Sequence, residues 1–115
     1  MEVKRMEVKR GDVVLCAARG DYGKPRPAVV VQSDLFNPTH ASITICPLTS
    51  DLEEARFFRL KIKPASSNGL KKVSQVMIDK INTLAEKRIG KVIGRISGSE
   101  VKELDAALKL WLALD

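Results

Sequence analysis

In Lys24-Pro25-Arg26-Pro27-Ala28-Val29-Val30-Val31, an arginine lies between two prolines and leads into three valines. Valine favours extended backbone, and an uninterrupted apolar run bounded by turn residues is typical of a strand buried on both faces. Each proline fixes its own φ and biases the residue before it toward extended structure, so Arg26 is excluded from a helix and begins the strand. We therefore expect the Arg26 guanidinium at the rim of a sheet. Considered alone, such an arginine is more often a surface cation paired with Asp or Glu.

Short strands are expected along most of the chain. The apolar or alternating segments are residues 13–17, 26–31, 43–46, 57–62, 73–78 and 92–96. Pro47 should end the third segment, and residues 48–51 should form a turn that carries two hydroxyl groups. Residues 85–88 resemble a short helical turn. Strands of this length with tight turns between them indicate a small barrel.

The C-terminal segment predicts an amphipathic helix. Ser97-Gly98-Ser99-Glu100 has the spacing of a capping box, in which a serine and a glutamate side chain satisfy the first backbone N–H groups. Val101, Leu104, Leu108 and Trp111 then recur at helical spacing, so the helix should run to about residue 114. The expected fold is therefore mainly β with one C-terminal helix.

Composition limits the class of protein. With 115 residues, 44% hydrophobic and 30% charged, the chain is expected to form one globular domain. No apolar run is long enough to span a membrane and no signal peptide is evident, which favours a soluble cytoplasmic protein. The net charge of +6 suits an anionic partner, either a nucleic acid or an acidic protein. Aromatic residues make up only 4%, so an extended base-stacking platform is not evident.

The N-terminus contains a repeat, since Met1-Glu2-Val3-Lys4-Arg5 recurs letter for letter at residues 6–10. We interpret residues 1–5 as a duplicated start and residues 6–115 as the single domain. Cys16 and Cys46 each lie in an apolar segment, where we expect reduced core thiols. His40 is the only histidine, and with no Cys/His cluster we expect neither a metal site nor a cofactor.

Five segments together resemble the MazF/PemK family of toxin endoribonucleases, which share a fold with the gyrase poison CcdB. They are Lys9-Arg10-Gly11-Asp12-Val13-Val14, Arg26-Pro27-Ala28-Val29-Val30-Val31, Pro47-Leu48-Thr49-Ser50, Val76-Met77-Ile78-Asp79 and Glu86-Lys87-Arg88-Ile89-Gly90. Each is weak by itself, but their order and spacing make the signal strong. The resemblance covers nearly the whole chain from Lys9.

The resemblance implies an SH3-like barrel of five to seven strands with a C-terminal helix, acting as a homodimer. It implies the toxin of a type II toxin–antitoxin system, a sequence-specific and metal-independent endoribonuclease that cleaves single-stranded mRNA by attack of a ribose 2′-hydroxyl on the scissile phosphate. The expected partners are RNA and an acidic antitoxin, with DNA reached only through the antitoxin and no membrane. One alternative is a non-catalytic, CcdB-like gyrase poison that depends on Trp111. Another is an inactive relative that only binds a partner.

The resemblance also assigns roles to residues. Arg26 matches the catalytic arginine of the family and would clamp the phosphate, for which a planar, permanently charged guanidinium is suited. Thr49 matches a threonine that works with that arginine, although a turn hydroxyl is the alternative. Asp21 lies where several members carry Glu or Gln, and it would be either a general base or a substrate contact. A solvated loop carboxylate is an equally common role for it.

Further RNA contacts are expected from loop and strand-end residues. The set comprises Arg19, Lys24, Ser50, Met77, Asp79 and Lys80. Lys80 replaces a glutamine usual in several members, and Met77 replaces an arginine that is catalytic in one branch. Such changes should alter which bases are read, because contacts to base edges carry sequence information whereas phosphate contacts do not. Asp79 would equally suit a structural carboxylate at a turn.

Overall fold

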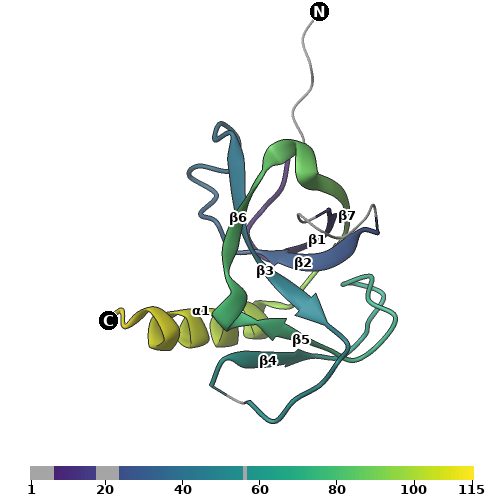
Figure 1. Cartoon of the computed structure of the whole chain (residues 1–115), viewed down its shortest axis with the longest axis vertical. Helices are drawn as coiled ribbons and strands as arrows, with labels where there is room; N and C mark the ends of the chain where they lie inside the picture. The colour runs from purple at the N-terminus through teal and green to yellow at the C-terminus, as the bar shows by residue number, and fades with distance from the viewer. Residues whose placement is uncertain (1–6, 18–23, 56) are drawn as a thin grey trace, which may run out of the picture.

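The computed structural model describes residues 7–17, 24–55 and 57–115 (Figure 1). Its strands are β1 (Asp12–Cys16), β2 (Arg26–Val30), β3 (Ser42–Thr49), β4 (Arg59–Ile62), β5 (Ser74–Met77), β6 (Asn82–Ala85) and β7 (Ile89–Arg95). Two 3₁₀ turns, η1 (Ile78–Lys80) and η2 (Glu86–Arg88), precede β6 and β7, and the helix α1 spans Gly98–Leu112. The predicted fold class, mainly β with one C-terminal helix, is confirmed.

The seven strands form one antiparallel sheet that is arranged around β3. The order is β4-β5-β3-β2-β1-β7, and β6 pairs with β3 as well. One edge of β3 pairs with β2. The other edge is shared, because Ser42–Ile45 pairs with β6 whereas Leu48 and Thr49 pair with β5. In Figure 1, β3 runs through the middle of the molecule, and β4 and β5 lie at its far end near α1.

The valines after Arg26 are buried on both faces of the sheet, as the sequence predicts. Val29 belongs to an apolar cluster that includes Leu104 and Leu108 of α1. Val30 belongs to a second cluster, which contains Ile43 and Ile45 of β3. Because successive side chains of a strand point to opposite faces, an unbroken apolar run suits a strand that contributes to two clusters at once.

The prediction that Pro47 ends the third strand is wrong, and of the turn predicted at residues 48–51 only Ser50 and Asp51 form a bend. β3 continues through Pro47, Leu48 and Thr49. Proline is tolerated there because β3 changes its partner: pairing with β6 extends as far as Ile45, and pairing with β5 begins at Leu48. No partner strand on that edge needs the N–H group that proline lacks.

Other boundaries differ as well. β6 (Asn82–Ala85) falls mostly in residues 79–84, for which the sequence indicated no element, and β7 is longer than the predicted segment near residues 92–96. Both strands are held by distant partners, β3 and β1 respectively, which a local pattern does not reveal. The expected helical turn at 85–88 is present as η2.

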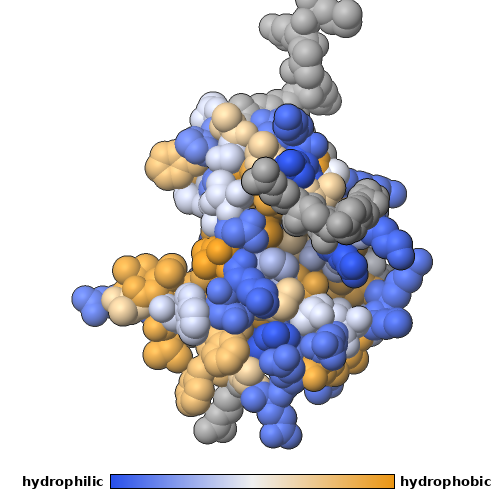
Figure 2. Space-filling view, in the orientation of Figure 1, coloured by the Kyte–Doolittle hydropathy of each residue, from blue (hydrophilic) through white to orange (hydrophobic). Residues whose placement is uncertain are grey.

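The helix begins as predicted and ends two residues early. The Ser97 hydroxyl accepts from the Glu100 N–H at 3.1 Å, and the Glu100 carboxylate accepts from the Ser97 N–H at 2.8 Å, completing the capping box. The helix ends at Leu112 because Ala113 adopts a left-handed conformation, with φ of 58°. Figure 2 shows apolar surface over α1, where Leu110 is exposed. No helix in the described ranges is long and apolar enough to cross a membrane.

Candidate active site

Arg26, the first residue of β2, is exposed and lines a cavity of about 330 Å³. Thr49, the last residue of β3, lines the same cavity. The other described residues in its walls are Cys16, Pro27, Ile45, Pro47, Leu48, Met77, Asn82 and Leu84. The described part of the cavity wall therefore combines one guanidinium, one hydroxyl and one carboxamide with mainly apolar side chains.

Strand pairing explains why Arg26 and Thr49 meet. β2 and β3 pair with Ala28 opposite Pro47 and Val30 opposite Ile45. This pairing ends at Ala28 and Pro47. Arg26 and Thr49 lie two residues further along the two antiparallel strands, at the same end of the pair. Two residues separated by more than twenty positions are thus brought to one end of the sheet.

The Thr49 hydroxyl bonds one partner among the described residues. It accepts from the Asp51 N–H at 3.1 Å, which turns the chain just after β3. A hydroxyl group has one donated hydrogen and two acceptor lone pairs, so this bond leaves the hydrogen available to a ligand. The two roles considered from the sequence, a turn hydroxyl and a site hydroxyl, are therefore compatible.

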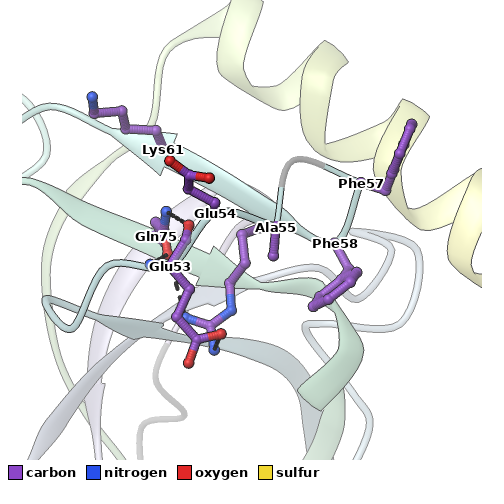
Figure 3. Close-up of a pocket in the computed structure, with 8 residues that line it drawn as sticks. Glu53, Glu54, Ala55, Phe57, Phe58, Lys61 and Gln75 are labelled. Atoms are coloured by element: carbon purple, nitrogen blue, oxygen red, sulfur yellow. Dashed lines mark hydrogen bonds and ion pairs between the residues drawn. The ribbon is translucent and has the colours of Figure 1, made fainter.

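The loop that follows Thr49 is clamped to β5 by Gln75 (Figure 3). The Gln75 amide accepts from the Glu53 N–H at 3.0 Å and donates to the Glu53 carbonyl at 2.8 Å. It also accepts from Arg59 at 3.3 Å, and Arg59 forms an ion pair with the Glu53 carboxylate at 3.5 Å. Because Gln75 pairs directly with Thr49 across the two strands, this clamp fixes the backbone on which Thr49 lies.

The structure does not place all of the predicted RNA-contacting residues in the cavity that Arg26 lines. Met77 lines the cavity with Arg26, whereas the remaining described members of that set are not among the lining residues. Lys24 and Ser50 are exposed, and Lys80 lies in η1. Asp79 is half-buried, and among the described residues no donor reaches its buried Oδ1. Asp21 and Arg19 lie outside the described residues.

Two relevant residues escaped the sequence analysis. Asn82 lines the cavity from β6, a strand that was not predicted. Gln75 lies within the strand predicted at residues 73–78, and a polar side chain flanked by Ser74 and the buried Val76 is the local sign that it has a structural role. Neither position follows from local sequence, because β3 is the element that brings both to the site.

Cys16 and Cys46 are buried and not joined by a disulfide, as predicted for core thiols. Burial raises the pKa of the Cys46 thiol to about 12, and the nearby Asp79 carboxylate acts in the same direction. In the described part of the chain, no group of three or more His, Cys, Asp or Glu side chains is placed to hold a metal ion.

A family model described as the PemK-like, MazF-like toxin of type II toxin–antitoxin systems matches residues 9–112. The chain belongs to this family. It is 38% identical over 108 residues to the probable endoribonuclease MazF of Mycolicibacterium smegmatis, an alignment that covers 93% of this chain and 98% of the relative. It is 35% identical over 116 residues to endoribonuclease MazF9 of Mycobacterium tuberculosis, with the same coverage.

Solved structures confirm the fold of this MazF-like chain. An endoribonuclease from a mycobacterial species superposes with a TM-score of 0.79 at 20% identity, covering 96% of this chain and 95% of the other. A MazE–MazF structure from Deinococcus radiodurans superposes with a TM-score of 0.77 at 22% identity, covering 96% of this chain and 100% of the other. At these identities the likeness concerns the fold alone.

Proposed function

We propose that this MazF-like toxin cuts single-stranded RNA at short sequence motifs, with Arg26 and Thr49 at the scissile phosphate. The chain is an endoribonuclease toxin, since relatives that carry this name are 38% and 35% identical to it over 93% of its length. The observation that supports the finer proposal is the cavity shared by Arg26 and Thr49, a cation and a hydroxyl supplied by neighbouring strands.

RNA contains its own nucleophile, the 2′-hydroxyl next to the scissile phosphate. An enzyme that uses it must align that oxygen, assist removal of its proton and stabilise the negative charge that builds up on the phosphate oxygens. The Arg26 guanidinium donates two parallel hydrogen bonds to those oxygens, and the Thr49 hydroxyl donates a third. The 2′-oxygen bonds to phosphorus as the bond from phosphorus to the 5′-oxygen breaks, and the departing 5′-oxygen takes up a proton, for which Arg26 is the candidate donor. The products are a 2′,3′-cyclic phosphate, or a 3′-phosphate after its hydrolysis, and a 5′-hydroxyl.

We assign the proton acceptor to the segment of sequence before β2. Asp21 remains our candidate for the general base or for a substrate contact, and Arg19 and Lys24 in the same segment would supply further positive charge to the RNA backbone. Ser50, Met77, Asp79 and Lys80 complete the proposed RNA-contacting set, of which Met77 lies in the cavity walls. No metal ion or organic cofactor takes part in this mechanism.

We further propose that the chain acts in the cytoplasm as a homodimer and is inhibited by a cognate acidic antitoxin. Two observations support this: solved neighbours include MazE–MazF structures and an endoribonuclease in complex with its cognate antitoxin, and this chain carries a net charge of +6. A basic protein surface attracts an acidic partner over long range. Any DNA contact is then made through the antitoxin.

The family match does not favour the gyrase-poison alternative. That function would depend on Trp111, which is 47% exposed and whose ring contacts Phe58, just before β4, with centroids 5.7 Å apart. The match with endoribonucleases also argues against the second alternative, that this chain is an inactive relative. Cleavage of RNA by the purified protein would exclude that alternative.

The test is cleavage of a long defined RNA by the purified protein in EDTA, with the 5′ ends of the products mapped. We expect discrete cuts at a recurring motif. Arg26→Ala should lower kcat by about 100-fold to 1000-fold, the usual cost of removing one donor to a developing oxyanion. Because Arg26 is exposed, the fold should lose less than about 0.5 kcal/mol. Near-native turnover by the folded variant would remove Arg26 from the mechanism.

A further inference from the structure

Asn82 supplies the third polar group of the Arg26 cavity. Among the described lining residues, side-chain oxygen or nitrogen atoms come from Arg26, Thr49 and Asn82. The rest of the wall is apolar or sulfur-bearing, and it includes Pro27, Met77 and other carbon-rich side chains. If the guanidinium and the hydroxyl bind the phosphate, the amide is left to contact another part of the substrate.

The Asn82 amide is oriented by the backbone. Asn82 is the first residue of β6, where it pairs with Ile45 of β3. Its Nδ2 donates to the Lys80 carbonyl at 3.2 Å. That bond uses one of the two amide hydrogens, and in the described part of the chain no hydrogen bond uses the second hydrogen or the amide oxygen. One donor and one acceptor are therefore presented together on an exposed, anchored group.

From this arrangement we infer that Asn82 selects the base next to the scissile phosphate. The inference rests on the proposed function and deepens it. Phosphate contacts position RNA without reading its sequence, so the groups that read it must reach base edges. Single-stranded RNA is read by splaying out a base, covering its faces and bonding its edge. In this cavity, the apolar walls would pack against the faces of the base, and the Asn82 amide would form hydrogen bonds with its edge.

Adenine is the expected base. Asn contacts adenine through one donated and one accepted hydrogen bond, which is the pair of functions that Asn82 presents. The volume of about 330 Å³ lies at the lower end of the range of ligand pockets, roughly 300–1,000 Å³. The cavity therefore has room for about one nucleotide, and a single base next to the cut should be selected in it.

The experiment compares base preference rather than rate. Wild type, Asn82→Ala and Asn82→Asp would each cut a short RNA library with randomised positions, and sequencing of the products would give the base frequencies on both sides of the cut. We expect wild type to favour adenine by roughly 10-fold to 100-fold at one adjoining position. Asn82→Ala should reduce that preference to about twofold. Asn82→Asp, which accepts but does not donate, should shift it toward cytosine.

Thr83→Ala is the matched control, because Thr83 follows Asn82 in β6 and its hydroxyl bonds Thr44 at 2.7 Å instead of lining the cavity. It should keep the wild-type preference. Base frequencies that are the same in wild type and both Asn82 variants would overturn the inference while leaving the nuclease intact, as would a wild type with no adenine preference beside the cut. A wild-type protein that leaves the library uncut would instead overturn the proposed function, and the inference with it.

Discussion

Gln75→Ala should destabilise the protein and release the loop that follows Thr49. The side chain is 9% exposed and makes three hydrogen bonds, two with the Glu53 backbone and one with Arg59. Each hydrogen bond contributes about 1 kcal/mol net, so Gln75→Ala should lower the free energy of unfolding by about 3 kcal/mol. That is a large part of a typical total stability of roughly 5–15 kcal/mol.

Urea unfolding followed by circular dichroism measures this change as a shift in midpoint at constant slope. Glu54→Ala is the control, because it removes an exposed carboxylate of the same loop but leaves both bonds between Gln75 and the Glu53 backbone. It should change the free energy of unfolding by less than about 0.5 kcal/mol, as is usual for a surface substitution. If Gln75→Ala were no less stable than Glu54→Ala, the clamp would not hold the loop.

The same variant has a second readout in RNA cleavage. Gln75 lies opposite Thr49 in the β3–β5 pair, so a released loop lets the Thr49 hydroxyl move away from the phosphate. A displacement of about 1 Å at a reacting group can cost about 100-fold in rate. We expect Gln75→Ala, measured where it remains folded, to lose at least tenfold in kcat with a smaller change in KM. Unchanged kcat would show that Thr49 does not depend on the clamp.

Two further predictions concern the core. Leu104→Ala, at a fully buried helix position, should lower the free energy of unfolding by about 2–5 kcal/mol. Leu110→Ala, at an exposed position of the same helix, should change it by less than about 0.5 kcal/mol. Equal losses of the two variants in urea titrations would contradict the packing of α1. The Cys46 thiol should resist alkylation at pH 8 until the chain unfolds, which peptide mass spectrometry would detect. The folded pKa of the Cys46 thiol, about 12, exceeds the ordinary value of 9.0. The thiol therefore contributes fully to the free energy of unfolding below pH 9, and this contribution is lost as the pH rises toward 12. Cys46→Ala should not show this pH-dependent loss.

Local features were predictable because their causes are local. The prolines beside Arg26 and the valines after it specify a buried strand that begins with a cation. Ser97 and Glu100 specify the start of the helix, because the capping box closes within four residues. In these segments the backbone preference and the apolar pattern agree, and no distant partner is needed to choose the conformation.

The site itself was decided by tertiary structure. β3 passes through Pro47 because its partner changes there from β6 to β5, and this exchange depends on segments far away in sequence. The register between β2 and β3 brings Thr49 to Arg26, and the pairing of β6 with β3 brings Asn82 into the same cavity. Sequence by itself therefore determined which cation begins the buried strand β2. Only strand pairing decided which groups surround that cation, because register is chosen by the burial of whole strands and not by neighbouring residues.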